Sequence, residues 1–174
     1  MKPSITNDDV YKIIIAFLKV ATGYNTNNIL RAYIDNVPLP AYPFVFITVL
    51  KNIRSATNEK ETTDTETLHQ EKVSTSRILD VQLDFYGQDS IDEANAVESL
   101  FRDGYAVNYF QSSGIIPLYA DGIITIGSGA DENENFKVRS TITLHFNLHP
   151  EVIVPQNFFD DIDLVTETIT NKIL

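Results

Sequence analysis

Apolar residues recur at helical spacing near the start of the chain, between Val10 and Ala21. Thr6 stands where a helix N-cap is expected, and acidic residues follow it in the first turn, where the helix dipole favours negative charge. Gly23 stands where such a helix ends. The spacing therefore predicts an amphipathic helix with one face in the core. Its apolar positions are Val10, Ile13, Ile14, Phe17, Leu18 and Ala21.

A second helical pattern follows Gly87. The segment 90–93, Ser-Ile-Asp-Glu, has the form of a capping box, in which Ser at the N-cap is followed three residues later by Glu. Gly104 interrupts the pattern, and residues 105–110 are predicted to add one more turn. The apolar face of this predicted helix consists of Ala94, Val97, Leu100 and Phe101.

Two segments alternate apolar and polar residues with the period of two that is typical of half-buried strands, namely 79–85 and 136–148. Residues 44–53 are rich in β-branched and aromatic residues and indicate a third long strand. The shorter candidate strands are 115–119, 123–126, 152–154 and 161–169.

Polar or irregular segments separate these elements. Residues 55–67 contain no apolar residue except Ala56, so a polar, flexible loop or the tip of a long hairpin is expected at about 55–68. Residues 29–34 are expected to form a short helical turn. The stretch 127–133, rich in Gly, Asp and Asn, is expected to form a turn between strands.

The predicted elements run helix, strand, strand, helix and then several strands. Because strands and helices do not alternate regularly, a doubly wound parallel sheet is not expected. The sequence predicts an α+β fold, with a mixed, mostly antiparallel sheet and two main helices packed on one face. A length of 174 residues suits a single domain covering 1–174.

Charge is spread unevenly along the chain. The formal net charge is -11, with +3 in residues 1–58, -8 in 59–103 and -6 in 104–174. Such a chain is not suited to gripping nucleic-acid phosphates, which requires clustered Lys and Arg. The absence of cysteine excludes disulfides, thiolate metal sites and cysteine nucleophiles.

The start of the chain does not have the pattern of a signal peptide. The longest apolar runs are 13–18 and 44–50, far short of the roughly 20 residues that a membrane-spanning helix needs. We therefore expect no membrane association and a location in the cytoplasm, or in a particle assembled there.

Two short motifs resemble ligand-binding loops, but neither has the required residues at the required spacing. Gly127-Ser128-Gly129 matches half of a dinucleotide fingerprint, but Glu132 stands at the third glycine. Residues 131–135 offer oxygen ligands at alternate positions, but Phe136 replaces the sharp-turn glycine of a calcium loop. An acidic turn is the better interpretation. No catalytic residue, cofactor site or metal site is predicted.

The chain contains three histidines, His69, His145 and His149. None lies in a His-Glu-x-x-His pattern. His145 lies on the more polar face of its predicted strand, where a solvated side chain is expected. His145 and His149 become candidate ligands only if folding brings acidic residues beside them.

Several short segments between residues 29 and about 160 occur in a characteristic order and spacing. In this order they resemble the neck or tail terminator proteins of bacteriophages, which are also called tail completion proteins. The segments are Asp84-Phe85-Tyr86-Gly87, Leu100-Phe101-Arg102-Asp103, Tyr105-Ala106, Gly114, Ile116-Pro117-Leu118-Tyr119-Ala120-Asp121, Asn133-Glu134, the strand from Arg139 to Asn147, and Val154-Pro155-Gln156-Asn157-Phe158-Phe159.

The resemblance implies a structural subunit of the virion that forms a ring with copies of itself, commonly six. Such a ring caps the tail tube and meets the head-side connector. The implied partners are the chain itself, the tail tube protein and the head–tail connector protein, with genomic DNA only passing through. The resemblance implies no catalytic residue and no cofactor. Assembly is expected in the cytoplasm of the bacterial host.

Charge and hairpin length suggest how such a ring would work. Six copies carry six times -11, or -66 formal charges, and a negative lumen would repel the DNA backbone. The polar hairpin is long enough to reach a neighbour and extend its sheet by strand addition. For the acidic residues, ordinary solvated loops are the alternative interpretation. The candidates for the lumen or an interface are Glu59, Glu61, Asp64, Glu66, Asp131, Glu132 and Glu134.

Two other functions are compatible with the sequence. Another head–tail connector or tail tube subunit would share the acidic α+β character. A small enzyme or ligand-binding domain with a carboxylate site belongs to a different class, and the motif search gives it no positive support.

Overall fold

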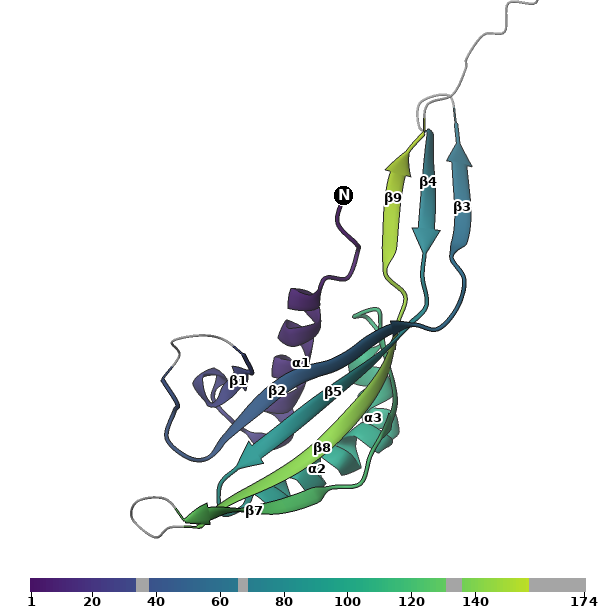
Figure 1. Ribbon diagram of the computed structural model, residues 1–174. Helices are drawn as coiled ribbons and strands as arrows, with labels where there is room; N and C mark the ends of the chain where they lie inside the picture. The colour runs from purple at the N-terminus through teal and green to yellow at the C-terminus, as the bar shows by residue number, and fades with distance from the viewer. Residues whose placement is uncertain (34–37, 66–68, 131–135, 157–174) are drawn as a thin grey trace, which may run out of the picture.

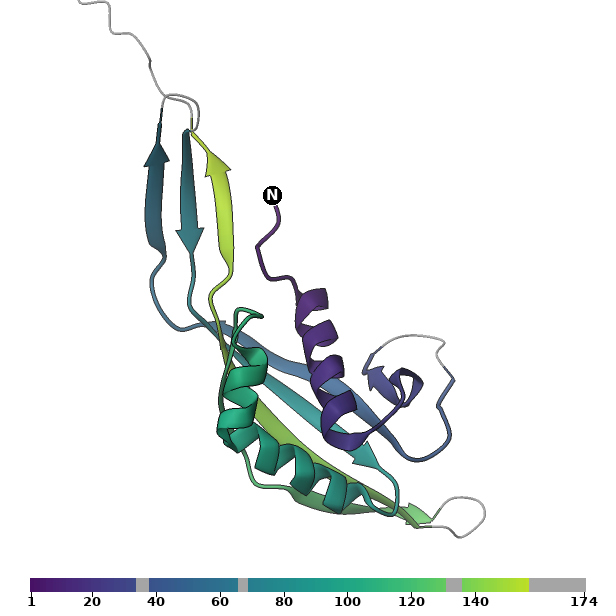
Figure 2. The same cartoon turned by 180° about the vertical axis from the view of Figure 1, so that it is seen from behind.

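The computed structural model describes residues 1–33, 38–65, 69–130 and 136–156. The chain forms a main β-sheet with three helices on one face, and a smaller three-stranded sheet projects from one end of it (Figures 1 and 2). The predicted α+β class, with a mixed, mostly antiparallel sheet and helices on one face, is confirmed.

The helices are α1 (Asn7–Thr22), the short 3-10 helix η1 (Thr26–Asn28), α2 (Ser90–Arg102) and α3 (Gly104–Phe110). The main sheet contains β1 (Ile29–Arg31), β2 (Phe44–Arg54), β5 (Arg77–Tyr86), β6 (Ile115–Ala120), β7 (Ile124–Ala130) and β8 (Phe136–Leu148). The smaller sheet contains β3 (Glu59–Asp64), β4 (His69–Ser74) and β9 (Glu151–Pro155).

The main sheet has two edges that are formed by different strands. The order is β1-β2-β5-β8-β6, and β7 also pairs with β8. Only β1 and β2 are parallel, and the other pairs are antiparallel. Because β6 pairs with the second half of β8 and β7 with the first half, these two strands share one edge, and β1 forms the other.

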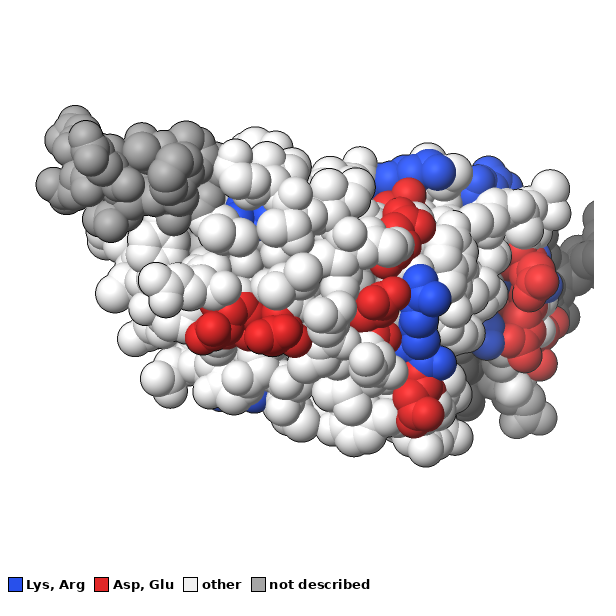
Figure 3. Space-filling model, turned by 90° about the horizontal axis from the view of Figure 1, so that it is seen from below, with Lys and Arg blue, Asp and Glu red and all other residues white. Residues whose placement is uncertain are grey.

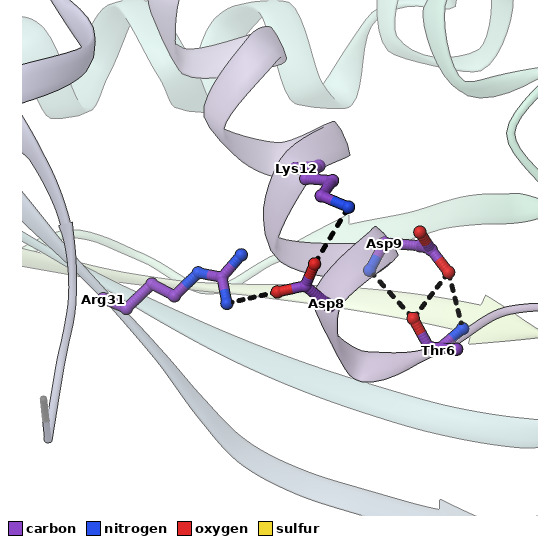
Figure 4. Close-up of polar contacts among 5 residues, drawn as sticks. All are labelled: Thr6, Asp8, Asp9, Lys12 and Arg31. Atoms are coloured by element: carbon purple, nitrogen blue, oxygen red, sulfur yellow. Dashed lines mark hydrogen bonds and ion pairs between the residues drawn. The ribbon is translucent and has the colours of Figure 1, made fainter.

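Helix α1 begins and ends where the sequence predicts. The Thr6 side chain accepts a hydrogen bond from the backbone N–H of Asp9, whose carboxylate accepts one from the N–H of Thr6 (Figure 4). Gly23 adopts a φ of 73°, the left-handed conformation that favours glycine at a helix end. The buried face contains Val10, Ile14, Phe17 and Leu18.

Acidification is expected to weaken this helix cap. Hydrogen bonds from the Thr6 hydroxyl and backbone lower the pKa of Asp9 below its usual 3.8. The folded-state pKa therefore lies below the unfolded value, so the contribution of Asp9 to stability is complete above pH 3.8 and is lost as the pH falls through the folded pKa. In the Asp9→Asn variant, this part of the dependence of stability on pH should be absent. Thermal unfolding midpoints between about pH 6 and about pH 2 measure it.

The matched control is Glu59→Gln, an exposed acid outside any helix. Its pH profile should follow that of the unmodified chain. An Asp9→Asn profile equal to that of Glu59→Gln would contradict the assignment of the acid dependence to the cap.

The capping box predicted for α2 is wrong. The N-cap is Asp89, without a side-chain cap, and Ser90 is fully buried inside the first turn. The Ser90 hydroxyl lies 3.1 Å from the hydroxyl of Ser140 on β8, so it joins the helix to the sheet and does not cap its own helix. Asp103 caps the following α3 by accepting from the N–H of Tyr105 at 2.9 Å.

Two other predictions of local structure are wrong. Ile29–Arg31 is strand β1, paired with β2, and the helical turn lies just before it in η1. Residues 127–130 belong to β7 and pair with β8. Backbone pairing with a long neighbouring strand thus overrides the turn preference of the glycines. The predicted strand at 161–169 lies outside the described residues.

The hydrophobic core lies between the helices and one face of the main sheet. It is rich in phenylalanine, and each fully buried side chain of this kind contributes about 1.5–3 kcal/mol. Within the described residues, no helix covers the opposite face of the sheet, as Figures 1 and 2 show from the two sides. No helix in the described part of the chain is long and apolar enough to cross a membrane.

The smaller sheet, here called the arm, continues the three central strands. Residues 55–58 lead from β2 into β3, residues 75–76 lead from β4 into β5, and residues 149–150 lead from β8 into β9. The strand order in the arm, β3-β4-β9, repeats that of β2-β5-β8. The sequence predicted a polar loop or a hairpin tip here, and residues 59–64 form a hairpin strand.

Backbone hydrogen bonds hold the junction between the arm and the main sheet. The N–H of Ser55 donates to the carbonyl of Ser76 at 2.9 Å, and the N–H of Thr75 donates to that of Pro150 at 3.2 Å. The N–H of Ser4 donates to the carbonyl of Glu151 at 2.8 Å, which ties the start of the chain to β9. The arm is therefore joined to the body by three short connections, which these backbone hydrogen bonds hold together.

Candidate functional site

The arm carries three of the predicted acidic residues. Glu59, Glu61 and Asp64 all lie on β3, the outer strand of the hairpin. Glu66, Asp131, Glu132 and Glu134 lie outside the described residues, so the structure does not place them. Whether any of these side chains faces a lumen stays a prediction.

A lysine and a histidine on the neighbouring strand pair with two acids of β3. Lys72 Nζ lies 2.6 Å from Glu61 Oε2, and His69 Nδ1 lies 2.6 Å from Asp64 Oδ1. The Lys72 hydrogen bond holds the pKa of the Glu61 carboxyl below its usual value. A further pair joins Lys60 to Glu71 across the hairpin at 2.6 Å. The arm is thus a mixed-charge surface.

Acidic side chains elsewhere are also interspersed. Viewed from below, they form separate groups, with Lys and Arg side chains between some of them (Figure 3). The net charge of -11 therefore does not collect into one patch on this face.

A histidine lies between two aspartates on the helix-free face of the main sheet. His145 Nδ1 lies 2.8 Å from Asp80 Oδ1, the residue opposite it on β5. Its Nε2 lies 3.2 Å from Asp121 Oδ2, in an orientation that does not meet hydrogen-bond geometry. Tyr119 stacks on the imidazole ring at 4.2 Å, and Lys51 Nζ lies 3.7 Å from the second Asp80 oxygen.

The prediction of a solvated His145 is wrong, because Tyr119 and the two aspartates cover it to 9% exposure. Folding does bring acids beside His145, but they approach opposite nitrogens of the ring and do not converge on one point. No group of three or more potential ligands in the described residues could hold a metal ion. The contacts hold β5, β6 and β8 together. His149 is exposed.

A second polar network on this face surrounds Asp84, which is 6% exposed. Its two carboxylate oxygens accept hydrogen bonds from Thr141 Oγ1 at 2.6 Å and from Gln82 Nε2 at 2.8 Å. Arg139 Nε lies 3.5 Å away. The contacts of Asp84 with Thr141 and Arg139 join β5 to β8 and help to fix the register of the two strands.

Sequence reasoning missed the His145 cluster because it needs the strand register. Alternation placed Asp80 and His145 on the polar faces of their strands, but only the pairing of β5 with β8 makes them direct neighbours. The available signal was only that both long alternating segments carry ionisable residues on that face.

One hollow of about 320 Å³ lies where the first residues, the start of α1 and the base of the arm meet. Its lining includes Ile5, Val10 and Leu148, together with Arg77. Arg77 already donates to the side-chain and backbone oxygens of Asn52 at 2.6 and 3.0 Å. The hollow therefore offers mainly apolar packing surface.

The family model described as phage neck terminator protein matches residues 8–172, and the chain belongs to this family. The resemblance predicted from the sequence is confirmed, and the chain is a structural protein of the phage neck and hence of the virion.

Comparisons with curated proteins and with solved structures give no further support for a function. A comparison with curated proteins found no significant match. Among solved structures, one similar chain is 12% identical, is covered over its full length and covers 91% of this chain with a TM-score of 0.38. A likeness at this level carries no argument about function.

Proposed function

We propose that this chain forms a ring, of six copies as the family resemblance implies, that ends the tail tube and joins it to the head–tail connector. Membership of the neck terminator family is the observation that carries this proposal. The ring's partners would be the chain itself, the tail tube protein and the connector protein. Genomic DNA would pass through without specific binding.

The arm supports a role in joining. It extends beyond the globular part of the chain, and among the described residues its outer strand β3 pairs only with β4 (Figure 1). An unpaired strand edge is a template for strand addition by another chain. We propose that the arm contacts a neighbouring copy or the next protein along the neck through this edge.

Removal of the arm hairpin is expected to prevent the joining of heads to tails. Deleting residues 57–68 removes β3 and leaves β4 paired only with β9. Electron microscopy of phage carrying this deletion should show separate heads and tails, as should phage lacking the protein. Normally joined particles from the deletion phage would contradict the proposed role of the arm. Normally joined particles from phage lacking the protein would contradict the proposed function of the whole chain.

A matched control separates loss of the arm from loss of its charges. The variant Glu59→Gln with Lys60→Gln keeps the hairpin and removes one charge of each sign. It should produce joined particles. Circular dichroism of the deleted chain should show a helical signal like that of the parent, because all three helices pack on the main sheet.

We also propose that acidic residues of the arm face the path of DNA. Repulsion between like charges would keep the DNA backbone from sticking as it passes. Reversing the charges of Glu59, Glu61 and Asp64 to Lys is expected to slow DNA ejection, measured by dye uptake after receptor-triggered release.

The control for charge reversal is Asp92→Lys with Glu98→Lys, two acids on α2 in the helix layer. This variant should eject DNA at the normal rate. Equal rates for the arm variant and the parent would overturn the lumen proposal and would leave the proposal of a joining ring in place.

A further inference from the structure

Strands β6 and β7 present an apolar edge of the main sheet to solvent. Five large apolar side chains on these strands are each at least 44% exposed. The two strands lie one after the other along β8, and this row of exposed apolar residues along one side of the sheet is here called the apolar edge. Its residues are Ile116, Leu118, Tyr119, Ile124 and Ile126.

The apolar edge lacks the usual protection of a free strand. Between residues 104 and 130 the only charged residue is Asp121, although 21% of the chain is charged. Free edges are normally protected by charged residues, especially Lys, because unpaired backbone groups beside apolar side chains promote association. Pro117 blocks one backbone donor of β6 but leaves the apolar side chains exposed. This composition indicates an edge that another chain covers.

A second exposed apolar surface lies at the opposite edge of the sheet. Tyr33 follows β1 and is 94% exposed, and Leu39 and Tyr42, just before β2, are 68% and 50% exposed. These three residues are here called the β1 patch. Tyr33 has a φ of 62°, which a bulky side chain rarely adopts, so the backbone is strained at the point that turns this aromatic ring outward.

Charge favours contact between the two different edges over contact between like edges. Residues 89–110, which form α2 and α3 beside the apolar edge, carry five acids and one base, a net -4. Residues 7–42, which include α1, β1 and the three residues of the β1 patch, carry three bases and three acids, a net charge of zero. Pairing two apolar edges would bring two regions of -4 together, whereas pairing an apolar edge with a β1 patch avoids this repulsion.

We propose that the apolar edge of one copy packs against the β1 patch of the next copy, head to tail. A contact between two different surfaces repeats from copy to copy and closes into a ring when the rotation between copies divides a full turn, whereas a contact between two identical surfaces stops at a dimer. The occupant of the apolar edge is therefore a second copy of this chain. The inference rests on the proposed ring and assigns the surfaces that build it.

The absence of cysteine from the chain makes a direct cross-linking test possible. Phage particles would carry Leu39→Cys, Ile126→Cys, or both substitutions in one chain. Purified particles would be treated with a short bismaleimide, and the protein would be followed on denaturing gels. The double variant should give a ladder of cross-linked multimers, and the ladder should be lost in both single variants.

Three results would overturn the inference. The first is a gel pattern for the double variant that matches the patterns of the single variants. The second is a cross-linked dimer from Ile126→Cys alone, and the third is a cross-linked dimer from Leu39→Cys alone. The control is Ile153→Cys combined with Leu39→Cys, because Ile153 is 52% exposed but lies on the arm. A ladder of equal strength from this pair would show that cross-linking does not report the proposed contact.

The experiments distinguish an error in the assigned contact surfaces from an error in the proposed function. If phage lacking the protein make unjoined heads and tails but the double variant does not cross-link, the ring proposal stands and the assigned surfaces are wrong. If phage lacking the protein assemble normally, the proposed function itself fails.

Discussion

Replacing Phe110 by Ala is expected to lower the free energy of unfolding by about 3–5 kcal/mol. Phe110 is fully buried at the end of α3, and its ring centroid lies 5.1 Å from that of Phe17 on α1 and 5.5 Å from that of Phe146 on β8. Truncation would leave a cavity where these elements meet. Urea unfolding followed by circular dichroism measures the loss.

The control on the same helix is Tyr105→Ala. Tyr105 is 38% exposed and stacks only at the surface, with its ring 6.2 Å from that of Tyr109. Its loss should be about 1 kcal/mol or less. Similar losses for the two variants would show that the intrinsic stability of α3, and not the packing of Phe110 in the core, sets the effect.

Replacing Asp80 by Ala is expected to lower the free energy of unfolding by about 2 kcal/mol. The substitution removes the hydrogen-bond partner of the buried His145 and the nearest anion to Lys51. Asp80→Asn keeps an oxygen that can accept from His145 Nδ1 and should retain most of the stability. Urea unfolding of the three chains at one pH provides the comparison.

A double-mutant cycle tests whether Asp80 acts through His145. Asp80→Ala, His145→Ala and the double variant should show a coupling of about 0.5–3 kcal/mol, as expected for residues in direct contact. Purely additive losses would contradict the contact. Glu59→Ala, at an exposed position of the arm, should couple with neither residue.

Elements with local signals were predicted well from the sequence. Helix α1 has its cap, its periodic apolar face and its terminating glycine within one short segment, so no distant contact is needed to recognise it. The long strands β5 and β8 show a clean period of two, because the sheet has one face in the core and one face free of helices.

The errors share a physical cause. Strand β1 and the last residues of β7 are extended because each pairs with the strand that follows it in the chain, although their own composition suggests turns. Ser90 looked like a cap, but its hydroxyl bonds to Ser140, far along the chain. His145 looked solvated because alternation indicates a face of a strand and does not show what covers that face.

Candidate sites were predicted less completely than elements. The acidic residues of β3 were singled out by charge alone, and the cross-strand partners of Glu61 and Asp64 became visible only with the hairpin register. The apolar edge was not predicted, because the exposure of Ile124 and Ile126 depends on their position at the edge of the sheet.

The continuity between the arm and the main sheet has a mechanical consequence. Each arm strand leads within a few residues into one of the three central strands. A pull on the arm tip therefore acts along these strands, whose hydrogen bonds to one another run perpendicular to the chain direction. The load would be shared by many bonds in shear and would not peel them apart one at a time. An arm connected in this way would resist tension along its length.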